Sequence, residues 1–383
     1  MHTFRMIVHA RERNALEAEG SRDTATQQRS KRNIMMFSVR ARLFRGRGTG
    51  VSRMRANVAF ISKYKIQLAN GEGEDSMSTM TQSRVQALID TIQERIAGVE
   101  RITDLDARHN AIFDVVPTLK AEAEQALADD PDALKEAMDA LRDAFDRFKH
   151  ANAIPRLPYS SDVDARYPYR DALGQPVHIA VLWDATSKVM EPISSHASNT
   201  LRIEDLYPYV DPRIDNHTRG QAYENMLYSR KIVAADLRDE REYDLIGQRG
   251  VFAARRIQAG ECLGVYGGRL MSAAMFFCCV DDTFVLDAAA GASVTFVDGE
   301  NILAMANTSL AYNADGKAVC QADDRGYNME ARTFHASSYC GRQFSIRAFF
   351  ASQAIASGTE LRWNYRYSPD MVRHVFGRAD DRG

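Results

Sequence analysis

The stretch Thr-Glu-Leu-Arg-Trp-Asn-Tyr-Arg-Tyr at residues 359–367 says more about the fold than any other part of this 383-residue chain. Upstream of it, residues 307–313 read Asn-Thr-Ser-Leu-Ala-Tyr-Asn and residues 249–254 read Arg-Gly-Val-Phe-Ala-Ala. Each fragment is common by itself. Their order and spacing predict one folded site to which an asparagine, a glycine turn and a tyrosine all contribute.

The sequence around these fragments predicts a mostly β domain over residues 230–370. After residue 230 the chain consists of short apolar runs separated by Gly, Asp and Asn, which is typical of many short strands joined by turns. No predicted strand is followed by a Gly-x-Gly-x-x-Gly turn that opens a helix, so a Rossmann-type nucleotide site has no support from the sequence. Residues 371–383 are expected to form a C-terminal tail.

Residues 80–150 predict a small helical unit. Apolar residues between Val85 and Val99 recur at steps of three and four, and a second stripe follows the helix-start pair Asp130-Pro131. Between these stripes a third helix is expected over residues 112–127, interrupted at Pro117. Such stripes form an internal core more often than a face that binds a partner.

Residues 151–229 predict an irregular region ahead of the β domain, because prolines punctuate it throughout. Residues 176–183 are its one clear strand candidate. The histidines at positions 178, 196 and 217 are too scattered to predict a metal site.

Residues 1–79 predict a basic, disordered segment. The first 70 residues hold 15 Lys and Arg against 4 Asp and Glu, and they show no sustained apolar periodicity. Three interpretations stay open: a solvated basic tail, or residues upstream of a true start at Met77 or Met80; an arm that binds nucleic acid or a membrane surface; and an organelle transit segment. The first interpretation is favoured.

The five cysteines form no zinc-binding spacing, so no metal is expected. Their low number favours a reducing, cytoplasmic location, and no apolar run is long enough to span a membrane. Delivery into a host cell or into a nucleus stays open.

Four pieces of the β domain, taken together, resemble the SET-domain family of protein lysine methyltransferases. The family pattern G-x-G-V-x-A, G-E and Y-x-G corresponds here to residues 250–253, 260–261 and 266–268. Residues 284–288 resemble the family's central strand, residues 307–313 its N-H-S-C-x-P-N segment, and residues 355–365 its I-x-x-G-x-E-L-x-x-x-Y segment. The resemblance covers residues 230–370 and implies an α+β protein whose C-terminal half is a mostly β, SET-like (β-clip) domain.

The resemblance also implies a reaction and a site. It implies transfer of a methyl group from S-adenosyl-L-methionine to a lysine side chain of a protein substrate, which could be histone-like. A lysine attacks only as the free amine and its pKa is about 10.4, so an apolar aromatic channel is needed to favour the neutral form. By the resemblance, Tyr365 places its hydroxyl beside the transferring methyl, Tyr266 and Tyr367 line the channel, and the residues that contact the cofactor are Arg249, Gly250, Asn307 and Thr308.

The sequence departs from the family pattern at several positions. Gln248 replaces the first motif glycine, although Gly247 precedes it and a shifted turn could serve. Thr308 replaces the histidine that ties this segment to the C-terminal tyrosine strand in the family. The zinc-binding cysteines that follow many SET domains are absent, so residues 368–376 or an upstream segment would have to close the channel. The remaining departures are Leu310, Tyr312 and Ala304.

Two other functions remain open. A non-catalytic binding module of the same β-clip type, SAF-like or a degenerate SET domain, would account for residues 249–263 but would not require Asn307 or Tyr365. Alternatively, the basic N-terminus could bind nucleic acid, with steep salt dependence. If the chain is an enzyme, residues 80–228 are the expected region for substrate recognition.

Overall fold

The computed structural model describes residues 74–184, 191–192, 203–323 and 326–376. The chain divides into two compact units, residues 1–86 and 87–383, and the second unit contains most of the described residues. The disorder predicted for the basic N-terminus lies outside the described residues up to residue 73. Residues 74–79, at its end, already belong to the first helix.

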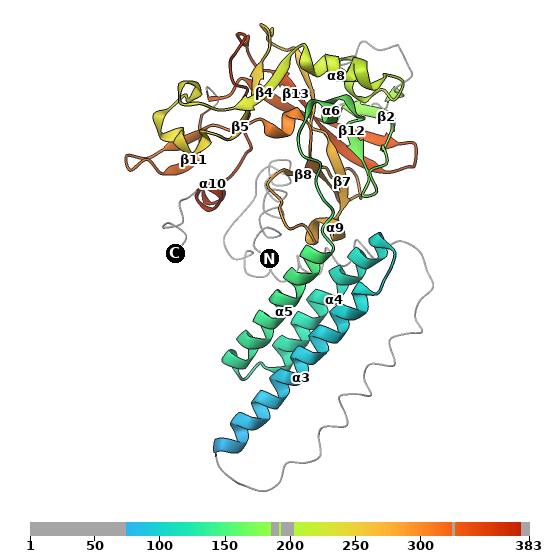
Figure 1. Ribbon diagram of the computed structural model, residues 1–383, viewed down its shortest axis with the longest axis vertical. Helices are drawn as coiled ribbons and strands as arrows, with labels where there is room; N and C mark the ends of the chain where they lie inside the picture. The colour runs from blue at the N-terminus through green and yellow to red at the C-terminus, as the bar shows by residue number, and fades with distance from the viewer. Residues whose placement is uncertain (1–73, 185–190, 193–202, 324–325, 377–383) are drawn as a thin grey trace, which may run out of the picture. The chain divides into compact units, whose positions relative to one another are not determined.

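Three helices, α3, α4 and α5, occupy the predicted helical region and run side by side (Figure 1). Asp104 and Asp130 cap the second and third of them, since each carboxylate accepts a hydrogen bond from the backbone N–H three residues later. Side chains from all three helices share one core, which includes Ile92, Ile112 and Phe148. Their bounds are α3 (Glu74–Glu100), α4 (Leu105–Ala126) and α5 (Pro131–Ala151).

Pro117 lies inside α4 and does not interrupt it, so the predicted break is wrong. A proline within a helix removes one backbone hydrogen bond and favours a kink. Here Ile112 and Leu119, on either side of the proline, are both buried in the shared core. Tertiary packing therefore holds the helix through a position at which local propensity predicts a break.

The helices also pack on the β domain through the short helix α9 (Ala273–Phe277). The ring of Phe277 stacks on Phe145 with centroids 4.7 Å apart and meets Phe113 edge-on at 5.3 Å. Aromatic pairs of this kind contribute roughly 0.5–1.5 kcal/mol beyond the area that they bury. The helical unit and the β domain thus share part of one core.

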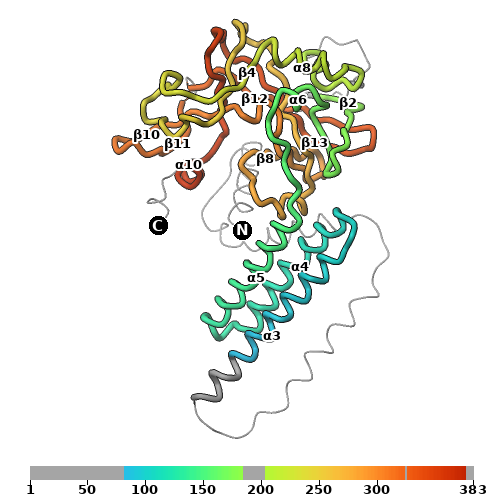
Figure 2. Tube along the Cα trace, viewed as in Figure 1, coloured from blue at the N-terminus to red at the C-terminus, as the bar shows by residue number. Residues whose placement is uncertain are grey.

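Residues 203–376 are mostly β, and together with the helices they confirm the predicted α+β class. The larger sheet has the strand order β3-β2-β12-β13-β6, and the long antiparallel pair β12–β13 lies within it (Figure 2). The second sheet has the order β1-β7-β9-β8, and β4–β5 and β10–β11 form two-stranded ribbons. The strand bounds are β1 (Tyr169–Arg170), β2 (Ile179–Asp184), β3 (Glu191–Pro192), β4 (Leu227–Lys231), β5 (Arg249–Ala253), β6 (Cys262–Val265), β7 (Gly268–Ser272), β8 (Val285–Asp287), β9 (Thr295–Gly299), β10 (Leu310–Tyr312), β11 (Ala318–Gln321), β12 (Met329–Ser338) and β13 (Gln343–Ala351).

The region at residues 151–229 is more regular than the sequence predicts. Its strand β2 lies beside β12, β1 pairs in parallel with β7, and β4 forms a ribbon with β5. Prolines punctuate the region, but they leave short segments that pair with strands far away in the sequence. The remaining helical elements of the chain are α6 (Ser161–Ala165), η3 (Glu204–Leu206), α7 (Tyr207–Val210), α8 (Asn216–Glu224), η4 (Ala234–Asp236), η5 (Glu240–Leu245), η6 (Ile302–Met305) and α10 (Pro369–Phe376).

The main core lies within the β part of the chain. Phe344, Phe349 and Phe350 of β13 are fully buried in it, together with Val251 of β5 and Leu263 of β6. The sequence predicts a C-terminal tail from residue 371, but helix α10 begins at Pro369 and continues to Phe376. Among the described residues, no helix is both long enough and apolar enough to cross a membrane.

Candidate active site

The structure brings together the three fragments that the sequence singles out. After β13 the chain returns alongside β5, where the Leu361 N–H donates to the Val251 carbonyl at 2.7 Å. Two residues later the Trp363 N–H donates to the Asn307 carbonyl at 3.1 Å. Residues 360–363 therefore lie between β5 and the segment that contains Asn307.

The half-buried Asn307 side chain joins all three fragments. Its Nδ2 donates to Glu360 Oε1 at 3.0 Å and to the Arg249 carbonyl at 3.2 Å. These two bonds fix the orientation of the amide. Its Oδ1 receives no hydrogen bond from the residues that the structure describes and can still accept one.

The turn before β5 is built on Gly247. This residue has φ +86°, a conformation that favours glycine, whereas Gln248 does not have positive φ. The turn is thus shifted by one residue, which is the arrangement that the sequence left open. Further on, a Cβ added to Gly250 would lie 2.9 Å from Glu360 Oε1, so close packing requires a glycine there. Arg249 is exposed, and its Nη1 lies 3.4 Å from the Ser229 carbonyl.

Tyr365 lies at the end of the returning segment. Its hydroxyl donates to the Ala306 carbonyl at 2.8 Å, directly before Asn307. Burial raises the pKa of Tyr365 well above its usual value, with the neighbouring Tyr367 adding to the shift. The phenol is therefore neutral at physiological pH and acts as a hydrogen-bond donor.

The three predicted tyrosines belong to one continuous run of aromatic rings. Burial raises the pKa of Tyr266 and of Tyr367 as well, and the Tyr266 hydroxyl donates to the Phe284 carbonyl at 2.7 Å. This run is an apolar surface edged with neutral hydroxyls. Successive centroids are 6.4 Å apart for Tyr266–Phe349, 4.9 Å for Phe349–Trp363, 4.9 Å for Trp363–Tyr365, 5.4 Å for Tyr365–Tyr367 and 6.2 Å for Tyr367–Phe376.

A left-handed residue separates the last two tyrosines of the run. Arg366 has φ +58°, and its N–H is held by Asn364 Oδ1 at 2.7 Å. A non-glycine residue in this region costs on the order of 1–3 kcal/mol and persists only where its surroundings impose it. The turn allows Tyr365 and Tyr367 to meet edge-on instead of pointing to opposite sides.

Thr308, which replaces the family histidine, is linked to the tyrosine segment by Gln321. Gln321 Nε2 donates to Thr308 Oγ1 at 2.6 Å, and Gln321 Oε1 accepts from the Tyr367 N–H at 3.3 Å. Gln321 is opposite Leu310 in the β10–β11 ribbon, so strand pairing places it within reach of both partners. The sequence analysis missed this residue, because no motif or spacing marks it.

An ionic cluster lies behind the asparagine and was also missed; Glu242, Glu360 and Arg362 are its buried members, and the exposed Arg238 lies at its edge. Arg362 is 0% exposed; its Nε donates to Glu360 Oε2 at 2.7 Å and its Nη1 to Glu242 Oε1. Arg238 donates to the backbone carbonyl of Glu360 at 2.8 Å, and its charge also acts on the carboxylates of Glu242 and Glu360. Burial disfavours the charged form of Arg362, but hydrogen bonds and ion pairs with both carboxylates hold its pKa above the usual value. The cluster thereby links Asn307, through Glu360, to the helix η5.

The site offers several groups to a cofactor and no metal centre. An amide oxygen on Asn307, the backbone near Gly250 and the aromatic run suit an organic molecule with both polar and apolar parts. The described residues contain no group of three or more His, Cys, Asp or Glu side chains arranged to hold a metal ion. Two cavities elsewhere, of about 140 and 600 Å³, are not lined by the three tyrosines.

Comparison with known proteins gives similarity to solved structures alone. No family model matches the chain, and no curated protein matches it in sequence. The structure of a humanized mutant of the Chaetomium thermophilum Polycomb Repressive Complex 2 bound to an inhibitor is 20% identical, with a TM-score of 0.26 over 39% of this chain and 16% of that chain. An autoinhibited ctPRC2 bound to S-adenosylmethionine is 18% identical, with a TM-score of 0.26 over 43% and 17% of the two chains.

KRYPTONITE in complex with mCHG DNA and SAH is 18% identical, with a TM-score of 0.23 over 32% of this chain and 22% of that chain. These structural neighbours are SET-domain methyltransferases. The present chain spans only about a fifth or less of the length of the chains that it matches. The similarity is therefore partial, and it does not bear on catalysis.

Proposed function

We propose that this chain is an S-adenosyl-L-methionine-dependent methyltransferase that modifies a lysine side chain of a protein substrate. One observation carries the proposal. Residues 360–363 lie between β5 and the segment that contains Asn307. As a result, the Tyr365 hydroxyl donates a hydrogen bond to the Ala306 carbonyl, directly before Asn307. A methyl transfer site needs a binding edge for the donor beside a hydroxyl-lined channel for the amine, and the proximity of Asn307 and Tyr365 supports such an arrangement.

The residues that would hold the cofactor are Arg249, Gly250, Asn307 and Thr308. The Asn307 Oδ1 is a suitable acceptor for an ammonium group, whereas the space beside Gly250 is filled by Glu360 and Ile232, so Gly250 would contribute through its backbone groups alone. When bound, S-adenosyl-L-methionine supplies a methyl group on a sulfonium, which is a good leaving group. The chain itself contributes alignment and the exclusion of water.

The aromatic run would favour the reactive state of the substrate. Removal of water around a lysine amine disfavours its ammonium form, so the pKa of a lysine enclosed by Tyr266, Tyr365 and Tyr367 would fall. The raised pKa values of these tyrosines keep their hydroxyls neutral, so none of them is a phenolate base near neutral pH. The lysine proton would leave to solvent before transfer.

The experiment is cofactor binding and methyl transfer measured on the full chain. Calorimetry should detect binding of S-adenosyl-L-methionine, and a radiolabelled methyl group should appear on lysines of a protein extract or of histones. Tyr365→Phe should lose the transfer and keep cofactor binding. Tyr339→Phe is the matched control, because Tyr339 is 71% exposed and lies outside the aromatic run. Absence of cofactor binding by the wild-type chain would reject the proposal.

One observation favours the alternative, a non-catalytic β-clip module that is SAF-like or a degenerate SET domain. The Asn307 Nδ2 is already hydrogen-bonded to Glu360 and Arg249, so it has little capacity to hold a cofactor carboxylate. Under this alternative the Asn307–Glu360 contact is purely structural. The wild-type chain would then not bind S-adenosyl-L-methionine, and Asn307→Asp would change only the unfolding free energy.

The identity of the substrate and the location of the protein are also proposals. A lysine-bearing protein segment, with histone-like sequences as first candidates, fits the expected channel. Helix α10 brings Phe376 to 6.2 Å from the Tyr367 ring and could close one side of that channel. Binding of nucleic acid by the basic N-terminus, a cytoplasmic location and substrate recognition by residues 80–228 stay predictions.

A further inference from the structure

The side chain of Arg249 lies at the edge of the candidate cofactor site, and no ion pair balances its charge among the residues that the structure describes. The Arg249 carbonyl accepts from Asn307 Nδ2 at 3.2 Å, so the two residues are adjacent. Arg249 is exposed, and its Nη1 reaches only the carbonyl and the hydroxyl of Ser229, at the long distances of 3.4 and 3.5 Å. Its N–H groups are therefore available to a bound anion.

The ring of Tyr159 supports the Arg249 guanidinium from one side. Arg249 Cζ lies 5.5 Å from the ring centre, which is within the range of a cation–π contact. Tyr159 is half-buried and packs against the main core, so the ring itself is held in place. A guanidinium carries several N–H donors in one plane, and a ring on one side leaves donors for a carboxylate. The exposed Glu224 acts on Tyr159 from the same neighbourhood but forms no ion pair with Arg249 within the described part of the chain.

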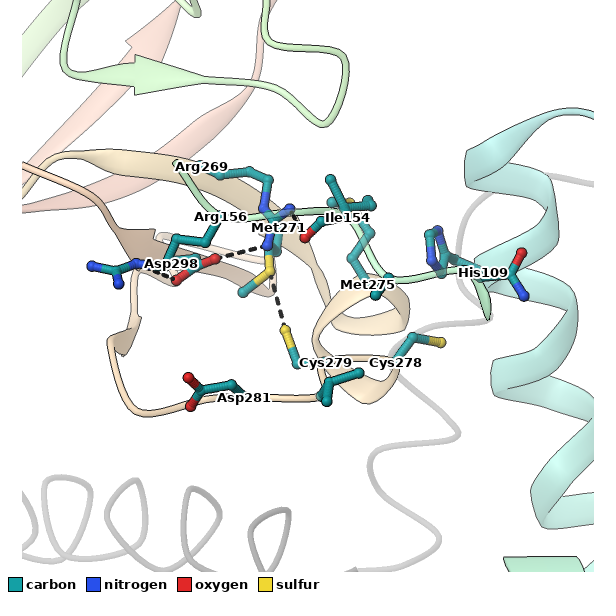
Figure 3. Close-up of a pocket in the computed structure, with 13 residues that line it drawn as sticks. His109, Ile154, Arg156, Arg269, Met271, Met275, Cys278, Cys279, Asp281 and Asp298 are labelled. Carbon is teal, nitrogen blue, oxygen red and sulfur yellow. Dashed lines mark hydrogen bonds and ion pairs between the residues drawn. The ribbon is translucent and has the colours of Figure 1, made fainter. Parts of the chain in front are cut away.

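The segment that carries Tyr159 is fastened to the β domain. A dashed line in Figure 3 marks the ion pair between Arg156 Nε and Asp298 Oδ1, which are 3.5 Å apart. The next residue, Leu157, donates its N–H to Glu300 Oε1 at 2.9 Å. These contacts attach the segment to β9 and to the residue that follows this strand. The β domain therefore fixes the place from which the tyrosine extends.

One buried carboxylate links Tyr159 to the asparagine segment. Asp164 is 3% exposed; its Oδ2 accepts from the Tyr159 hydroxyl at 3.1 Å, and its Oδ1 accepts from the Ile302 N–H at 2.7 Å. Ile302 begins the helix η6, and the chain reaches Asn307 two residues after this helix ends. The same side chain thus holds the ring that supports Arg249 and the start of the helix that leads to Asn307.

These contacts return to Asn307 and so form a closed circuit. Helix η6 also packs against β5, the strand that begins with Arg249. The circuit therefore fixes how the Arg249 side chain lies relative to the Asn307 amide. It runs from Asn307 to Arg249, then to Tyr159, to Asp164, and through Ile302 and η6 back to Asn307.

We propose that Arg249 binds the carboxylate at the amino-acid end of S-adenosyl-L-methionine and that Tyr159 positions Arg249 for this contact. The inference rests on the proposed function, since it concerns the same cofactor. Asn307 Oδ1 is the acceptor for the ammonium group of that end, and a guanidinium is a strong donor for its carboxylate. The two groups are attached to one carbon atom, so their partners have to be adjacent, as Arg249 and Asn307 are. Arg249 thus selects a cofactor with an intact amino-acid end.

The test compares two cofactors on the full chain by calorimetry. These are S-adenosyl-L-methionine and its decarboxylated form, which keeps the adenosine, the sulfonium and the amine. The wild-type chain should bind the complete cofactor about ten-fold or more tightly, because a hydrogen bond to a charged group contributes a factor of that order. Equal or tighter binding of the decarboxylated form would overturn the inference and leave the proposed function standing. Absence of binding by both cofactors would reject the proposed function and the inference with it.

Variants assign this preference to the two residues. Arg249→Gln should reduce it to about two-fold or less, whereas Arg256→Gln, the same charge change at an exposed position outside the circuit, should retain it. Tyr159→Leu removes the supporting ring and should lower the preference about five-fold, and Tyr159→Phe keeps the ring and should stay within about two-fold of wild type. A general loss of structure would weaken both cofactors alike, so the ratio of affinities separates positioning from folding. An unchanged ratio in Arg249→Gln or in Tyr159→Leu, with the fold checked by circular dichroism, overturns the proposal.

Discussion

The tyrosine segment at residues 359–367 and the asparagine segment at residues 304–313 form the two sides of one site, but they are held by different means. The tyrosine segment shares backbone hydrogen bonds with distant segments, but its rings Trp363, Tyr365 and Tyr367 also contact one another as neighbours in sequence. The asparagine segment depends on distant partners, with Gln321 on Thr308 and Glu360 on Asn307. A motif can preserve the contacts between those rings, whereas only the folded chain can supply Gln321 and Glu360 to the asparagine segment.

The largest expected effect comes from breaking the ionic cluster that joins the two segments. Arg362→Met leaves Glu242 and Glu360 buried without their shared cation, and such a loss costs about 3–5 kcal/mol of unfolding free energy. Urea unfolding measures it. Arg332→Met, which removes an exposed ion pair with Glu330, should cost about 1 kcal/mol or less. Equal effects of the two variants would contradict the importance of the cluster.

Tyr365→Phe separates chemistry from stability within the tyrosine segment. Loss of the hydroxyl should lower the methyl-transfer rate on the order of 100-fold, as expected for a positioned donor in a dry site. The unfolding free energy should fall by only about 1 kcal/mol, since one hydrogen bond to the Ala306 carbonyl is lost. Single-turnover labelling and urea unfolding on the same preparation test both parts, and a rate within about two-fold of wild type would remove Tyr365 from the catalytic role.

A smaller effect, which depends on pH, is expected on the unfolding free energy from Asp164, whose carboxylate contacts the chain just before the asparagine segment. Asp164 Oδ1 accepts from the Ile302 N–H at 2.7 Å, and burial raises the pKa of Asp164 to about 7. Between the usual pKa of 3.8 and about 7, the folded state holds a proton that the unfolded state has lost. The contribution of Asp164 to stability is therefore fully present below about pH 4 and is lost as the pH rises to about 7.

The variant Asp164→Asn should flatten this part of the stability profile and leave the hydrogen bond to Ile302 in place. Asp162→Asn is the control, because Asp162 lies in the same helix and is exposed. Unfolding free energies measured from pH 4 to pH 8 decide the matter. A slope that persists in Asp164→Asn would assign it to another group.

The smallest effect on the unfolding free energy is expected from Gln321, which bridges the two segments by its hydrogen bonds to Thr308 and Tyr367. Gln321→Leu removes both bonds of the bridge, and Thr308→Val removes one of them without changing side-chain shape. Each variant should lower the unfolding free energy by about 1 kcal/mol. Because the two side chains share a bond, the double variant should be less destabilised than the sum of the single variants. Strict additivity would mean that the bridge does not hold the segments together.

Much of the fold class could be predicted from sequence, since periodicity and turn residues act locally. The helix cap at Asp130 and the short β runs are examples. The continuity of α4 through Pro117 could not be predicted, because packing against the neighbouring helices opposes the local preference. The strand β1 within residues 151–229 was missed for a related reason, since its partner β7 lies far along the chain, whereas β2 falls on the strand candidate at residues 176–183.

By itself the sequence determined which residues are available to the site: a glycine turn at 247, an asparagine at 307 and a tyrosine pair at 365 and 367. Those choices are local, because backbone conformation and ring spacing depend on near neighbours. Only the tertiary structure decided how Thr308 is tied to the tyrosines and which charges stand behind Asn307. Hydrogen bonds and buried ion pairs need atoms within about 3 Å, and for Gln321 and Glu242 only the folding of the whole domain supplies that proximity.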